Sequence, residues 1–188
     1  MAQIVVLFAV GAVLGTALDW VHVATATTRY THPVFLGLAW WVPLLFGSAA
    51  TAIGMSHTLI DLLLERTVRP ETRHVAIGLA LLLVLWATSG LVKPPRTALW
   101  VLAPASIAVW WAFDASVVGL VLALATASSG VAVEATLVSA GAFSYVAPDA
   151  GRVASWLPWL YVAASVAVGN LGRWLATRAP SNDTRTAH

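Results

Sequence analysis

Long apolar runs separated by short polar segments dominate this chain of 188 residues. A helix needs about 20 apolar residues to cross the hydrocarbon core of a bilayer, and six runs approach or exceed that length. The pattern therefore predicts an all-α integral membrane protein with six transmembrane helices. The predicted helices span about Ile4–Ala24, Val34–Met55, Val75–Val92, Ala98–Phe113, Val117–Val146 and Leu157–Leu175.

Turn-forming residues mark the ends of the later helices. Asp114 follows the fourth run and is the predicted N-cap of the fifth helix. Pro158 is tolerated in a first helical turn, so the sixth helix should begin near Leu157. The fifth run is about ten residues longer than a crossing requires. We therefore expect this helix to be tilted or irregular near Ser128-Ser129-Gly130, and to form the wall of a polar cavity.

The segment between the second and third runs mixes apolar and charged residues. From His57 to Thr72 it resembles an amphipathic extension lying on the membrane surface. Its His57, Asp61 and Glu65 are spaced for one helical face and could converge on a metal ion. Because Arg66 can pair with the carboxylates instead, we predict no metal site.

Composition excludes several classes of protein. The chain is 60% hydrophobic and 10% charged, with a mean hydropathy of +0.84, which is far outside the range of soluble domains. It has no cysteine, so disulfides, thiolate catalysis and Cys-type zinc sites are excluded. No hydrolase motif occurs, and we predict neither an enzyme nor a cofactor. The net charge of +2 is too small for nucleic-acid binding.

The basic residues predict the orientation of the chain. Six arginines fall with the termini, and three arginines and the lysine lie on the opposite side, which favours cytoplasmic termini. Arginine exceeds lysine nine to one in an alanine- and valine-rich chain, which favours a bacterial plasma membrane over the endoplasmic reticulum. The transmembrane domain should end near residue 179, and residues 180–188 form a polar tail predicted to be disordered.

Three ionisable residues lie within or beside the apolar runs. Asp19 and His22 are three residues apart near the end of the first helix, and Glu134 lies in the fifth run. A buried charge costs from about 2.5 kcal/mol upward on insertion scales, so such groups are paired or used. They fit a proton relay in a small transporter, the polar end of a ligand pocket, or, for Asp19 and His22, an interfacial position.

Small residues suggest that the chain associates with copies of itself. Gly11 and Gly15 offer one close-approach face, and Ala123, Ala125 and Ala127 offer another. We therefore predict a homo-oligomer, for which a trimer is one arrangement.

Several segments match a known family in order and spacing over roughly 140 residues. They are Ala39-Trp40-Trp41-Val42-Pro43, Ala52-Ile53-Gly54 with Ile60-Asp61, Trp110-Trp111-Ala112-Phe113-Asp114 with Gly119, Tyr145 with Pro148-Asp149, Arg152 with Ser155-Trp156-Leu157-Pro158, and Val168-Gly169-Asn170-Leu171-Gly172-Arg173. With these segments the chain resembles the Insig family of sterol-sensing membrane proteins.

The resemblance implies a six-helix bundle with a small lipid or sterol in an intramembrane cavity. It also implies that Asp114 is a partner-binding residue, because animal members need the matching aspartate to associate with Scap. Ala115-Ser116-Val117-Val118 replaces the basic, serine-rich segment of the family, which argues against the Scap and HMG-CoA reductase partnerships.

In a bacterial member, diacylglycerol is a reasonable substitute for a sterol. The predicted lipid-binding residues are Asp19, His22, Trp41, Thr97, Trp100, Ala103 and Glu134. Two alternatives stay open, a proton-linked transporter and a protein of the TspO type, although the Trp-Ala-Pro-rich loop of the latter is not found.

Overall fold

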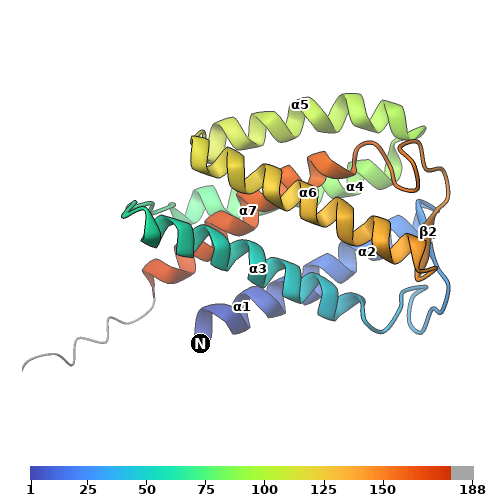
Figure 1. Cartoon of the computed structure of the whole chain (residues 1–188), viewed down its shortest axis with the longest axis horizontal. Helices are drawn as coiled ribbons and strands as arrows, with labels where there is room; N and C mark the ends of the chain where they lie inside the picture. The colour runs from blue at the N-terminus through green and yellow to red at the C-terminus, as the bar shows by residue number, and fades with distance from the viewer. Residues whose placement is uncertain (179–188) are drawn as a thin grey trace, which may run out of the picture.

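The computed structural model describes residues 1–178, which form a helical bundle around its last helix, α7 (Leu157–Thr177) (Figure 1). The first membrane helix consists of α1 (Ala2–Val10), a π-helical turn η1 (Gly11–Gly15) and α2 (Thr16–Ala24). The others are α3 (Val42–Leu63), α4 (Thr72–Leu91), α5 (Pro95–Phe113) and α6 (Val117–Ser139). The predicted six-helix class is confirmed. The strands β1 (Thr28–Tyr30) and β2 (Phe143–Tyr145) were not predicted.

The helix α7 differs from the others in what surrounds it. The other five membrane helices are long and apolar enough to cross a bilayer, whereas α7, with Asn170 and Arg173, is not among them. Every residue from Val162 to Arg173 is buried. A Cβ atom at Gly169 would lie 2.6 Å from the ring of His57 on α3, so the glycine permits close packing. This central helix can carry polar groups because other helices, not lipid, surround it.

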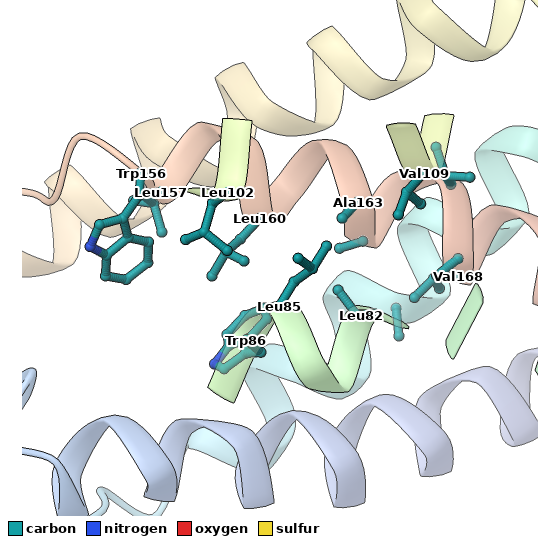
Figure 2. Close-up of a cluster of buried hydrophobic side chains, with 14 of the residues drawn as sticks. Leu82, Leu85, Trp86, Leu102, Val109, Trp156, Leu157, Leu160, Ala163 and Val168 are labelled. Atoms are coloured by element: carbon teal, nitrogen blue, oxygen red, sulfur yellow. The ribbon is translucent and has the colours of Figure 1, made fainter. Parts of the chain in front are cut away.

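The hydrophobic core lies where α4 and α5 pack against α7. Figure 2 shows leucines, a valine and a tryptophan from α4 and α5 packed against α7. The contributing residues are Leu82, Leu85 and Trp86 of α4, Leu102 and Val109 of α5, and Leu157, Leu160, Ala163 and Val168 of α7, with Trp156 just before it. Burial of these side chains fixes α4, α5 and α7 relative to one another.

Most of the small residues predicted to join subunits are used inside the chain. A Cβ atom at Gly11 would lie 2.4 Å from Cβ of Ala50, and one at Gly15 would lie 2.5 Å from the side chain of Phe46. Both contacts bring the first helix close to α3. Ala123 of α6 is also fully buried within the chain. The glycine face and Ala123 are therefore not available to a contact between subunits, whereas Ala125 is exposed.

The second membrane helix is shifted from its predicted position. It begins at Val42, not Val34, because Leu36 and Gly37 adopt positive φ and turn the chain before the first helical turn at Pro43. It continues to Leu63 because His57 and Asp61 are buried. The prediction of a surface helix beginning at His57 is therefore wrong.

The fifth membrane helix is shorter than predicted and has a different cap. It ends at Ser139, not Val146, and Gly141 at φ +74° turns the chain into β2. The expected extra length is therefore a turn and a strand, and no tilt or irregularity is needed. The N-cap is Ser116, whose Oγ accepts a 3.0 Å hydrogen bond from the Gly119 amide, and not Asp114.

Candidate functional site

A cavity of about 570 Å³ lies between α3 and α6, beside α7. The residues on its two long walls follow one face of each helix, at spacings of three or four. They include Ser48, Ala52 and Ser56 of α3, and Ala125, Ser129 and Val133 of α6. All six are exposed at the surface of the bundle. The mouth of the cavity therefore opens sideways between two membrane-spanning helices, toward the lipid.

The two short strands close one end of the cavity. They pair antiparallel, with Thr28 opposite Tyr145 and Tyr30 opposite Phe143. Side chains alternate across a strand, and these four line the cavity, whereas the intervening Arg29 and Ser144 are exposed. The two-stranded sheet is thus the floor of the cavity and carries three hydroxyl groups into it.

Two carboxylates and the three tyrosines of the chain meet at this floor. The Tyr30 hydroxyl donates to Asp19, and the Tyr145 hydroxyl donates to Glu134. The Tyr161 hydroxyl also donates to Glu134, over 2.6 Å. Burial, reinforced by Asp19, raises the pKa of Tyr30, so its phenol keeps its proton and acts as the donor. Gly130 makes room for this arrangement, because a Cβ there would lie 2.5 Å from the Tyr161 ring.

His22 extends the polar floor toward α4. Its Nε2 lies 2.8 Å from Ser89 Oγ, and Ser89 in turn donates to the Trp86 carbonyl over 2.6 Å. Because the Ser89 proton is already committed, Nε2 is the donor to Ser89. The other ring nitrogen, Nδ1, lies 4.0 Å from Asp19 Oδ1, which is too long for a hydrogen bond.

The structure brings only part of the predicted lipid site together. Asp19, His22 and Glu134 line the cavity, and Trp41 packs edge-on against Tyr30, with ring centroids 5.5 Å apart. The other three predicted residues are on α5, which does not line this cavity. They are Thr97, Trp100 and Ala103, of which Trp100 is 77% exposed. The sequence placed one wall of the cavity on the fourth membrane helix, α5, but in the structure the second membrane helix, α3, forms that wall.

A second polar cluster lies near the opposite end of α7. Arg173 donates to Asp61 of α3 from Nε over 2.5 Å and to Asp114 from Nη1 over 2.9 Å. The Arg173 and Asp114 side chains are only 2% and 3% exposed. Arg66 also contacts Asp61, at 3.1 Å. Asp61 is therefore paired with arginines and does not converge with His57 and Glu65 on a metal ion.

Several cavity residues were not predicted from the sequence. Asp19 and Glu134 were found because a carboxylate in an apolar run is conspicuous. Their partners Tyr30 and Tyr161 were missed, because a tyrosine near the end of a membrane helix is ordinarily an interfacial anchor. With no Lys or Arg inside these runs, hydroxyl donors were the partners to look for.

Comparisons with known proteins place the chain in a family. It is 34% identical to the insulin-induced gene 1 protein of Danio rerio, over 91% of this chain and 71% of that protein. It is 33% identical to the Bos taurus protein over 93% of this chain, and spans 66% of that protein's length. No protein-family model matches the chain.

Solved structures agree with this result. The crystal structure of a mycobacterial Insig homologue from Mycobacterium vanbaalenii superposes with a TM-score of 0.84, at 28% identity, over 96% of this chain and 97% of that one. A structure of the cross-linked trimer of that homologue superposes equally well. The resemblance seen in the sequence is confirmed, and the chain belongs to the Insig family of integral membrane proteins.

Proposed function

We propose that this protein is a non-enzymatic lipid-binding protein that holds a neutral lipid, diacylglycerol or a sterol, in the cavity between α3 and α6. The observation that carries the proposal is a laterally open, largely apolar cavity whose carboxylates, histidine and tyrosines are gathered at one end. Its volume of about 570 Å³ lies within the ~300–1,000 Å³ typical of small-molecule sites. A hydroxyl head would reach the floor while its apolar body contacts the walls.

Lipid extraction from the purified protein tests this proposal. Mass spectrometry should find diacylglycerol or a sterol retained without added ligand. Ala52→Trp on α3 and Ala125→Trp on α6 place a large side chain at the cavity wall and should expel that lipid. Ala108→Trp, at an exposed position of α5 outside the cavity, is the matched control and should retain it. Bulk phospholipid alone, unchanged among all variants, would count against lipid binding here.

We also propose that both termini face the cytoplasm of a bacterial cell. The Gln3 side chain donates to the Gly172 carbonyl over 2.9 Å, so the N-terminus and the last turns of α7 lie at the same end of the bundle. The excess of arginine at that end supports the cytoplasmic side. In this cysteine-free chain, a single Ala2→Cys variant should react with an impermeant thiol reagent only after the cells are opened.

Self-association and partner binding are further parts of the proposal. The cross-linked trimer of the mycobacterial homologue supports a homo-oligomer, which analytical ultracentrifugation would test. Asp114 is engaged with Arg173 inside the chain. We infer that it would influence a partner by fixing the turn between α5 and α6, without touching that partner directly. Scap and HMG-CoA reductase stay unsupported as partners.

A proton-linked carrier is the second candidate function. It is favoured by three titratable groups, Asp19, His22 and Glu134, that line one cavity. Substrate-dependent flux in liposomes that is lost in Glu134→Gln would support it. The TspO alternative has no comparable support, since that type has five helices and residues 1–178 of this chain form six membrane helices, in the fold of the Insig homologue.

A further inference from the structure

The polar floor of the cavity is rich in hydrogen-bond acceptors and short of donors. The three tyrosine hydroxyls already donate to the carboxylates of Asp19 and Glu134. When ionised, each carboxylate has about four acceptor sites, so both can then accept more hydrogen bonds than these tyrosines supply. Within residues 1–178, no Lys or Arg forms an ion pair with either carboxylate. The floor therefore lacks a cation.

Asp19 and His22 show the same excess of acceptors over donors. The two side chains are 5% and 4% exposed, and Asp19 Oδ1 lies 4.0 Å from His22 Nδ1. Because Nε2 carries the proton donated to Ser89, Nδ1 of the neutral ring is an acceptor. Two buried acceptors face each other, and no donor from residues 1–178 lies between them.

An unpartnered hydroxyl at the same floor also points to a bound molecule. Thr28 is 3% exposed and lines the cavity, and in the described part of the chain its Oγ has no hydrogen-bond partner. A buried hydroxyl without a partner costs free energy that a ligand can recover by accepting from it or donating to it.

We propose that this floor selects a lipid by the donors of its head, and that it binds a primary ammonium head more tightly than a hydroxyl head. The proposal rests on the proposed lipid-binding function and specifies its ligand class. An ammonium group carries three donors and no acceptor, which matches Asp19, Glu134 and His22, and its charge supplies the missing cation. A carboxylate or phosphate head would bring acceptors and negative charge toward two carboxylates and is rejected.

Displacement of a fluorescent diacylglycerol from the protein in nanodiscs tests the selectivity. The competitors share one saturated eighteen-carbon chain and differ only in the head: octadecylamine, octadecanol, octadecanoic acid and octadecyltrimethylammonium. We expect the amine to displace the probe at roughly 5- to 10-fold lower concentration than the alcohol, and the acid to be ineffective. The trimethylammonium compound has charge but no N–H donor, so it should fall well short of the amine.

Charge-removing variants assign the effect to the floor. Glu134→Gln and Asp19→Asn should each reduce the preference for amine over alcohol, while the exposed Glu71→Gln should leave it unchanged. An alcohol as effective as the amine, or an acid equally effective, would overturn this inference even though the probe binds. Failure of both this probe and a fluorescent sterol to bind would overturn the proposed function. If one floor variant does not fold, the other variant and the ranking on the unmodified protein decide.

Discussion

Replacing Arg173 by methionine should destabilise the protein more than any other single loss of charge. The guanidinium is 2% exposed and holds two carboxylates, those of Asp61 and Asp114, which are 9% and 3% exposed. Methionine fills a similar volume but leaves both carboxylates without this partner. Removing one member of a buried ion pair costs about 3–5 kcal/mol.

The expected loss lies at the lower end of that range, about 3 kcal/mol. Arg66 still contacts Asp61 at 3.1 Å, and the Ser116 hydroxyl still donates to Asp114. Unfolding by sodium dodecyl sulfate, followed through the fluorescence of the ten tryptophans, gives the change in free energy directly. Arg178→Met is the matched control, because Arg178 is exposed at the end of α7 and its loss should cost at most about 1 kcal/mol.

Neutralising the partners provides the decisive comparison. In an Asp61→Asn, Asp114→Asn background, the same Arg173→Met change should cost less, because no uncompensated carboxylate remains. The expected coupling is about 1–3 kcal/mol. If Arg173→Met and Arg178→Met unfold at the same detergent concentration, or if the coupling is zero, the ion-pair cluster does not stabilise the bundle as inferred here.

Three further outcomes are expected. Gly15→Leu should cost about 1–3 kcal/mol, because its side chain would overlap Phe46, and Phe46→Ala should partly rescue it in the same unfolding assay. Ser116→Ala should cost about 1 kcal/mol through loss of the α6 N-cap, measured by thermal unfolding. Burial alone raises the pKa of the Asp114 carboxyl, but the hydrogen bonds from Ser116 and Arg173 outweigh it and lower the pKa below the ordinary 3.8. The stabilisation by ionised Asp114 is therefore complete above pH 3.8 and is lost as the pH falls through the folded-state pKa. On acidification, the melting temperature of Asp114→Asn should therefore fall less than that of the unmodified protein.

The sequence predicted the membrane helices well and their assembly poorly. Apolar runs identify a crossing helix because each run must satisfy its own backbone in lipid, independently of its neighbours. Helix ends depend on local turns, so Val34 and Val146 were misassigned where positive-φ residues redirect the chain. The strands β1 and β2 escaped prediction because each has only three residues, too few for an alternating pattern to be recognised in the sequence.

The same contrast between features of a single segment and features of the assembled helices applies to the candidate site. Asp19 and Glu134 were predicted because each is anomalous in its own run. Trp100 lies outside this cavity, and its place could not be derived from the sequence, because membership of a cavity depends on which helices are neighbours. Tryptophan is also common at membrane interfaces, so its chemistry alone does not distinguish a cavity wall from a lipid-facing anchor.

The two polar clusters are connected along one row of α7. Tyr161, Ser165, Gly169 and Arg173 follow at intervals of four and so lie on one face of the helix. Tyr161 donates to Glu134, the Ser165 hydroxyl lies 3.0 Å from His57 Nε2, and Arg173 binds Asp61. Gly169 gives the His57 ring the room it needs beside this row.

Such a row fixes the position of α7 more strictly than apolar packing does. Leucine and alanine faces tolerate small shifts, but a hydrogen-bonded row has one arrangement in which Tyr161, Ser165 and Arg173 all keep their partners. A displacement of α7 by one residue would rotate Tyr161, Ser165 and Arg173 away from their partners together. The same groups that make α7 too polar to face lipid therefore hold α3 and α6 in register around it, and so keep the cavity between those two helices open.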